Sequence, residues 1–351
     1  MTQKRALITG ITGQDGSYLA EYLLELGYEV HGFVRHSSVR NNLRIAHLQQ
    51  NKDFKEVFKL HDGDLTDPIS ILEVIANVEP DEIYNLAAQS HVKVSYSVPE
   101  FTSNVNAIGP LRILETMRIL DLADKTRFYQ ASTSELFGES TSGIYDENTH
   151  LAPNTPYGIS KLYAYWATRH FRETFGMFAS NGFLFSHESP RRGENFVSRK
   201  IVQAVARIAQ GSPEPLKLGN ISAERDWGHA RDYVRGIHAI VNHSVSDDFV
   251  LATGEIHSLK EFVELAFMAA DISIDWTGEG LDLKAIDRAN SQTVLEIDKL
   301  YFRPNVERVR KGDATKAIKE LDWVPRYSFK ALVEEMMESE LKAARGERSS
   351  R

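Results

Sequence analysis

The chain has 351 residues, more than the roughly 250 to 300 at which a single hydrophobic core stops growing, so one larger and one smaller domain are expected. It is 42% hydrophobic and 26% charged, and no apolar run approaches the roughly 18 residues of a membrane span. Its net charge of −8 argues against a nucleic-acid partner, and the absence of Cys excludes thiolate catalysis and thiolate metal sites. The 12 His show no metal-ligand spacing, so no metal is predicted.

The N-terminus passes at once into an apolar strand, which leaves no room for the apolar core of a signal peptide and favours a cytoplasmic location. Period-2 or continuous apolar patterns predict strands at 5–9, 29–34, 54–60, 82–86, 126–130 and 179–185. Helical periodicity alternates with them at 17–26, 68–77, 99–122 and 156–174. This βαβα order predicts an α/β fold with a Rossmann-type, doubly wound parallel sheet.

A change of texture after about residue 184, to loops rich in Arg and Gly, indicates a second domain. We expect residues 1–185 and about 230–272 to form a dinucleotide-binding domain. A smaller C-terminal α/β substrate domain should comprise about 186–229 and 273–345. The tail, 346–351, reads as flexible.

A glycine-rich turn lies between the first strand and the first helix. Its glycines would let backbone amides approach a dinucleotide pyrophosphate at the helix N-terminus, so the cofactor contacts expected here are Gly10, Thr12, Gly13, Gln14, Asp15 and Gly16. The spacing G-x-x-G-x-x-G is typical of short-chain dehydrogenases. Three glycines in a turn can also be structural punctuation, and the position directly after the first strand favours the binding role.

The end of the second strand selects the dinucleotide. An acidic residue there would bind a ribose 2′-hydroxyl, whereas Arg accepts a 2′-phosphate, and the segment carries Arg35 and no carboxylate. The sequence therefore favours NADP over NAD, with a solvated surface Arg as the alternative. Further cofactor contacts are expected after the third and fourth strands, although these positions could instead be routine loop and core: Asp64, Leu65, Leu86, Ala87 and Ala88.

Polar residues directly follow the fifth strand, at the carboxyl edge where the reacting end of the cofactor should lie. One hydroxyl among Ser132, Thr133 and Ser134 could hydrogen-bond a substrate hydroxyl that is being oxidised. Glu135 adds a carboxylate that a simple dehydrogenase or epimerase does not need, whereas a dehydratase needs a group to remove a proton next to a new ketone. A capping or surface role is the alternative for Glu135.

Tyr157 and Lys161 lie four residues apart, on one face of a predicted helix. A Tyr becomes a base near neutral pH only when a cation stabilises its phenolate, which Lys161 would supply. The Y-x-x-x-K spacing is frequent by chance, and its position after a glycine turn and five strands makes it a candidate catalytic pair.

Several long motifs resemble those of the GDP-mannose 4,6-dehydratases over nearly the whole chain. They are Thr9–Glu21, Asn85–Val92, Ala131–Leu136, Pro156–Trp166, His187–Gly193 and Arg225–Ala230. The resemblance implies a tightly held NADP that is restored each turnover, with Tyr157 as base toward the 4-hydroxyl and Glu135 as base toward carbon 5. It implies cofactor contacts at Ser90, Tyr157, Lys161, His187 and Arg192, and GDP-sugar contacts at Ser90, Thr133, Ser134, Glu135, Ser186, Lys200, Arg225 and Arg303.

The chain departs from the family pattern at three places. Ser186 stands where the family commonly has Asn, Val306 stands where Glu is usual, and residues 35–44 replace a loop that in relatives reaches a neighbouring subunit. A GDP-manno-heptose or another GDP-sugar therefore stays open as the substrate, as does an epimerase or reductase activity on the same fold. A binding protein that has lost catalysis is a further alternative, which the intact Tyr157 and Lys161 pair disfavours.

The helices at 99–122 and 156–174 carry apolar residues on more than one face. The resemblance implies that they pair with a second copy in a homodimer or homotetramer. Burial within the monomer explains the same periodicity.

Overall fold

The computed structural model describes residues 3–35, 37, 42–138, 143–301 and 310–347. They fall into two compact units. The first contains 1–185, 230–252 and 312–324, and the second contains 186–229, 253–311 and 325–351. Among the described residues, no helix is both long and apolar enough to cross a membrane.

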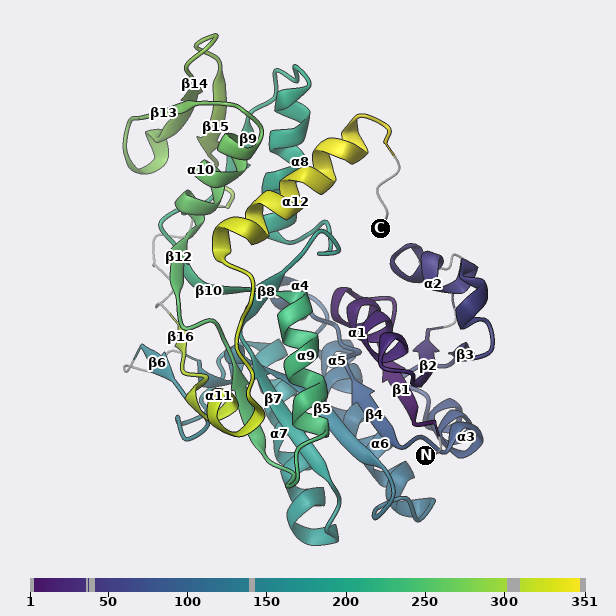
Figure 1. The fold of residues 1–351 in the computed structure, drawn as a ribbon. Coiled ribbons are helices and arrows are strands. Elements are labelled where there is room, and N and C mark those ends of the chain that lie inside the picture. The colour runs from purple at the N-terminus through teal and green to yellow at the C-terminus, as the bar shows by residue number, and fades with distance from the viewer. Residues whose placement is uncertain (1–2, 36, 38–41, 139–142, 302–309, 348–351) are drawn as a thin grey trace. The chain divides into compact units, whose positions relative to one another are not determined.

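The first unit is built on a seven-stranded parallel sheet with the strand order β11-β7-β5-β4-β1-β2-β3 (Figure 1). Its strands are β1 (Arg5–Thr9), β2 (Glu29–Val34), β3 (Phe58–Asp62), β4 (Glu82–Asn85), β5 (Arg127–Thr133), β7 (Ala179–Leu184) and β11 (Asp248–Leu251). The order reverses between β1 and β4, which is where ligands bind in doubly wound sheets. The predicted fold class is confirmed.

Helices cover both faces of this sheet. One face carries α1 (Gln14–Glu25), α9 (Ala230–Val241) and α11 (Thr315–Leu321), whose buried residues share a core with the strands. The other face carries α3 (Pro68–Val78), α6 (Gly109–Ile119) and α7 (Pro156–Phe175), which form a second core. Short elements connect them: η1 (Leu43–Ile45), α2 (Ala46–Gln50), η2 (Lys52–Phe54), α4 (Val92–Ser95), α5 (Pro99–Ser103), η3 (Asn104–Ile108), η4 (Ser134–Phe137), β6 (Ile144–Tyr145) and β16 (Lys311–Gly312).

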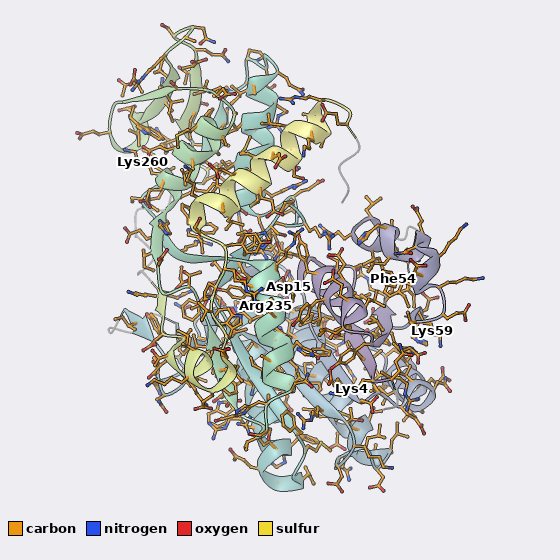
Figure 2. All side chains as sticks on the ribbon, viewed as in Figure 1. Lys4, Asp15, Phe54, Lys59, Arg235 and Lys260 are labelled. Atoms are coloured by element: carbon orange, nitrogen blue, oxygen red, sulfur yellow. The ribbon has the colours of Figure 1, made fainter. Side chains whose placement is uncertain are left out.

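Two predicted elements differ from the observed ones by more than three residues at one end or by division, whereas α1 begins three residues earlier than predicted and β5 ends three residues later. Residues 54–57 lie outside β3, because the Asn51 side chain accepts a hydrogen bond from the Asp53 amide and starts the turn η2, which ends at Phe54. The predicted helix 99–122 is three segments, since the π-helical turn η3 separates α5 from α6. Lys4 directly precedes β1, and Asp15 lies in the first turn of α1, which follows the glycine turn; both are labelled in Figure 2.

In its described residues, the second unit contains two small sheets and three longer helices. The three-stranded sheet has the order β12-β10-β8, and the four-stranded sheet has the order β13-β14-β15-β9. Their strands are β8 (Ser186–Glu188), β9 (Leu216–Leu218), β10 (Glu224–His229), β12 (Ile256–Ser258), β13 (Ile274–Thr277), β14 (Lys284–Asp287) and β15 (Thr293–Ile297). The helices are α8 (Val197–Ala209), α10 (Leu259–Ala269) and α12 (Phe329–Ala344), and the turn η5 (Gly280–Asp282) precedes β14.

The division between the units differs from the expected one at two segments. Residues 253–272 belong to the second unit, because α10 packs Phe262 and its other apolar residues into the core around Trp227 and Phe329. Residues 312–324 belong to the first unit, where the buried Trp323 donates a hydrogen bond from Nε1 to the Asp232 carbonyl at 2.8 Å. Of the predicted flexible tail, residues 348–351 lie outside the described residues.

Candidate active site

The glycine turn connects β1 to α1 and is held in a shape that larger residues would disturb. Gly10 has a φ of +73°, a conformation that L-residues with a side chain rarely adopt, and its carbonyl accepts a hydrogen bond from the Gly13 amide at 2.9 Å. A methyl group at Gly16 would lie 2.3 Å from the Gly10 carbonyl oxygen. Gly13 is the N-cap of α1, and Gln14 and Asp15 form its first turn. Backbone packed this closely at a helix N-terminus fits the pyrophosphate of a dinucleotide.

The ends of β2 and β3 carry the residues expected near the adenosine half of the cofactor. Arg35 is exposed directly after β2. The Asp64 carboxylate accepts hydrogen bonds from the amide and hydroxyl of Thr66, at 2.8 and 2.7 Å, so it also shapes the loop after β3. The Leu65 side chain is a core residue, and its carbonyl accepts a hydrogen bond from Arg112. An adenine contact by Asp64 or Leu65 therefore stays a prediction.

The segment after β4 lies against the glycine turn. A methyl group at Gly10 would be 2.8 Å from the Ala87 nitrogen, which shows how closely the two backbones approach. Leu86 and Ala87 pack against the two cores on either side of the sheet, Ala88 is half-buried, and Ser90 is exposed. Small side chains at this crossing leave room for a ligand at the switch point of the sheet.

The carboxyl end of β5 presents the hydroxyl and carboxylate predicted from the sequence. Thr133 ends the strand and its hydroxyl accepts a hydrogen bond from the Glu135 amide at 3.2 Å, which caps the short turn η4. Thr133 is buried, whereas Ser134 and Glu135 are half-buried. Thr133 therefore caps η4, and the role of the Glu135 side chain stays a prediction.

The first two turns of α7 place Tyr157 and Lys161 beside the end of β5. Thr155 caps the helix by accepting a hydrogen bond from the Gly158 amide at 2.9 Å, and the Tyr157 amide donates to the Ser95 hydroxyl at 3.2 Å. Lys161 is 3% exposed, and its Nζ donates to the Ala131 carbonyl at 2.8 Å. This bond ties the helix that carries Tyr157 and Lys161 to the strand that carries Thr133.

Burial determines how readily the Lys161 ammonium loses its proton. It lowers the pKa of the ammonium from 10.5 to about 8, because a charge is costly in an apolar interior. An ammonium with a pKa near 8 is still mostly charged at neutral pH, and a cation in a site of low dielectric acts strongly on a neighbouring phenol. The pair on α7 is therefore suited to proton transfer.

The second unit holds the remaining predicted contacts. His187 is buried on β8, next to the half-buried Ser186. Arg192 Nε forms a 3.0 Å ion pair with the buried Glu188, and its guanidinium stacks on Phe196 at 3.7 Å from the ring centre.

Lys200 lies over the Tyr301 ring at 4.0 Å, and burial lowers its pKa. Arg225 is half-buried on β10. Arg303 and Val306 lie outside the described residues. The predicted substrate contact at Arg303 therefore stays a prediction.

A family model and the most similar relatives that were compared all point to one protein family. The family model described as GDP-mannose 4,6 dehydratase matches residues 7–336. The chain belongs to the GDP-mannose 4,6-dehydratase family. It is 50% identical to the GDP-mannose 4,6-dehydratase of Sinorhizobium fredii, with 99% of each chain covered, and 48% identical to the human GDP-mannose 4,6 dehydratase, with 97% and 92% covered.

A solved dTDP-glucose 4,6-dehydratase from Bacillus anthracis, in complex with NAD, has a TM-score of 0.77. It is 20% identical, with 98% of each chain covered, and therefore shows the fold alone.

Sequence reasoning about this member of the GDP-mannose 4,6-dehydratase family missed several polar residues behind the site. Thr9, Asn85 and Gln130 are fully buried beneath the carboxyl edge of the sheet and are joined by side-chain hydrogen bonds. Asn106, in the π-helical turn η3, binds both the amide and the carbonyl of Gln89. Polar residues at the ends of β1 and β4 and within β5, all in apolar surroundings, were the available signal, because a buried amide requires hydrogen-bond partners.

Proposed function

We propose that this chain is a GDP-mannose 4,6-dehydratase that converts GDP-mannose to GDP-4-keto-6-deoxymannose with loss of water, using a bound NADP. The observation that carries the proposal is the junction of β5 and α7. There Lys161 donates to the Ala131 carbonyl, two residues before Thr133 and four before Glu135. Full-length similarity to curated dehydratases supports the same reaction.

In the proposed mechanism, the side chains of this chain move protons. Tyr157, as a phenolate stabilised by the Lys161 ammonium, takes the proton of the sugar 4-hydroxyl. The ketone formed at carbon 4 acidifies the proton on carbon 5, which Glu135 removes. Thr133 positions the hydroxyl, and Glu135 passes its proton to the hydroxyl that leaves carbon 6 as water. The bound cofactor would supply reversible hydride transfer from carbon 4 and back to carbon 6, so the reaction needs no net oxidant. The proton held by Tyr157 then returns to carbon 5, which restores both side chains to their starting states.

The glycine turn fits the pyrophosphate of NADP, because methyl groups at Gly10 and Gly16 would collide with the backbone of Ala87 and of Gly10 and would displace the turn. Arg35 supports NADP over NAD, since it stands at the end of β2 where a carboxylate would favour NAD. A second cation is nearby: Arg44 Nη1 donates to the Thr12 carbonyl at 3.3 Å. We infer that these two Arg residues contact the phosphates of the cofactor.

The second unit is proposed to bind the GDP moiety. Lys200 and Arg225 are cations suited to a diphosphate, and the pKa of Lys200 is lowered by burial, which indicates that its ammonium is partly removed from water. Arg303, His187 and Arg192 remain in the proposal as further contacts from the family resemblance. Of these three, His187 and Arg192 lie in the described part of the chain.

A homodimer is proposed from an exposed apolar face on α7. Ile159, Tyr163 and Trp166 recur at helical spacing and are 57%, 47% and 52% exposed. Tyr96, directly after α4, and Phe101, in α5, are also exposed, at 61% and 42%, and both of these helices contact α7. Exposed aromatic residues gathered on adjoining helices indicate a protein interface. A tetramer rests on residues 35–44, of which 36 and 38–41 lie outside the described residues. The cytoplasmic location stays a prediction of the sequence.

The test is incubation of the purified chain with GDP-mannose, followed by mass spectrometry and absorbance of the reduced cofactor. We expect a product lighter by one water and no net accumulation of NADPH. A panel of GDP-sugars that includes a GDP-manno-heptose identifies the preferred substrate, since Ser186 replaces the common Asn of the family. An unchanged mass for every GDP-sugar would refute the dehydratase assignment, and a mass-neutral isomer would indicate an epimerase.

A further inference from the structure

A buried chain of hydrogen bonds crosses three strands beneath the proposed site. The Ala87 amide donates to the Thr9 hydroxyl at 3.2 Å, and that hydroxyl donates to Asn85 Oδ1 at 2.6 Å. Asn85 Nδ2 donates to Gln130 Oε1 at 2.7 Å, and Gln130 Nε2 donates to the Ala131 carbonyl at 2.9 Å. Thr9, Asn85 and Gln130 are 2%, 0% and 0% exposed, so water does not compete for these bonds.

The direction of these hydrogen bonds is fixed at the Ala131 end. The Ala131 carbonyl can only accept, so Gln130 must face it with Nε2, which leaves Gln130 Oε1 to accept from Asn85 Nδ2 and Asn85 Oδ1 to accept from the Thr9 hydroxyl. The reverse orientation of the two amides would set Gln130 Oε1 against the Ala131 carbonyl oxygen, two acceptors with no hydrogen between them. Aligned bonds of this kind reinforce one another in a medium of low dielectric.

Both ends of the chain lie at the proposed site. At one end, the Ala87 nitrogen would be 2.8 Å from a methyl group at Gly10, so it packs against the glycine turn. At the other end, the Ala131 carbonyl accepts from Lys161 Nζ at 2.8 Å as well as from Gln130 Nε2. The two donors occupy the two lone pairs of one carbonyl oxygen, so Gln130 restricts where that oxygen, and the ammonium bound to it, can lie.

We propose that Gln130 is a positioning residue that holds Lys161 in place through the Ala131 carbonyl, as the last side chain in a buried series of hydrogen bonds that begins at the Ala87 amide, beside the glycine turn. The inference rests on the proposed function, because Lys161 matters for the rate only if it supports Tyr157. Gln130 itself touches neither substrate nor cofactor in this scheme. Its loss therefore misplaces the ammonium and lowers the rate of turnover, while the binding of the sugar nucleotide is unchanged.

The first experiment measures kcat and KM for GDP-mannose at saturating NADP with Gln130→Met, which has a similar length and no donor. We expect kcat to fall about tenfold or more with KM within about twofold. Thr9→Val, which removes the hydroxyl at the other end, should lower kcat in the same way, and Thr9→Ser, which keeps the hydroxyl, should restore it. The matched control is Thr126→Val. This buried hydroxyl donates to the Pro80 carbonyl at 2.6 Å and takes no part in the hydrogen bonds from Ala87 to Ala131, so kcat of the control should stay within about twofold of the parent value.

A second readout does not depend on activity. A double-mutant cycle of Gln130→Met with Lys161→Met, followed by urea unfolding, should show a coupling of at least about threefold in the unfolding equilibrium constant. If Gln130→Met does not fold, kcat is compared between Thr9→Val and Thr9→Ser instead. The double-mutant cycle is then measured with Thr9→Val and Lys161→Met. Additive effects in the cycle, or unchanged kcat in the folded variants, would overturn the proposal. If the parent chain does not dehydrate GDP-mannose, the proposed function fails by itself, and the cycle still decides whether Gln130 holds Lys161.

Discussion

Replacing Lys161 by Met should remove a pH dependence from the stability of the cofactor-free protein. Burial lowers the pKa of Lys161 from 10.5 to about 8 in the folded state. Below pH 8 both folded and unfolded states carry the charge, and the folded state bears the full cost of burying it. Between the two pKa values the unfolded chain binds the proton and the folded chain does not, so stability rises with pH across this window.

The size of the effect follows from the two pKa values. Linkage over a window from about pH 7.5 to about pH 9.5 gives a gain of about 2 kcal/mol for the parent chain. Lys161→Met has no such proton, so its stability should change by about 2 kcal/mol less over the same window. The other titrating groups are shared by both proteins, so they cancel when the variant is compared with the parent.

The assay is urea unfolding of both proteins, stripped of cofactor, at the two pH values, with the difference between the two changes as the result. The Met variant should also be the more stable protein near neutral pH and should lose catalysis. A more stable but inactive variant would show that the buried Lys161 ammonium lowers the stability of the folded protein while it supports catalysis. Equal changes with pH in parent and variant would show that the folded state does not penalise the ammonium, and would contradict the burial argument for this site.

Three further predictions concern other parts of the molecule. Glu135→Gln should still reduce the cofactor when GDP-mannose is added but release no water, as followed by absorbance and mass spectrometry, and dehydration at the parent rate would remove Glu135 from the mechanism. Gly16→Ala should abolish NADP retention and lower the free energy of unfolding in urea by about 1 to 3 kcal/mol, because its methyl group would lie 2.3 Å from the Gly10 carbonyl oxygen. A variant that keeps its cofactor would contradict the proposed role of the glycine turn in NADP binding. Trp166→Glu should convert the dimer to a monomer in analytical ultracentrifugation. The control Ile318→Glu, at a 46% exposed apolar site on the opposite face of the sheet, should remain a dimer. If both variants are dimers, the interface lies elsewhere.

The order of strands and helices could be predicted because each element carries its own periodicity. β1 and β2 begin and end where the sequence predicts, since short apolar runs bounded by polar residues define a buried strand. The interruption of the helix at 99–122 was missed. The π-helical turn η3 brings Asn106 to the backbone of Gln89, a contact between segments that helical periodicity does not encode.

The sequence by itself determined the types and spacing of the reactive side chains: the glycine turn, Thr133 and Glu135 after one strand, and Tyr157 and Lys161 one helical turn apart. These are local patterns, so they can be read without knowing which strands are neighbours. Only the tertiary structure decided that β4 lies between β1 and β5, which joins Thr9, Asn85 and Gln130 in one series of hydrogen bonds. Strand pairing and burial are properties of the whole fold, and they also give Lys161 its lowered pKa and the Ala131 carbonyl as its partner.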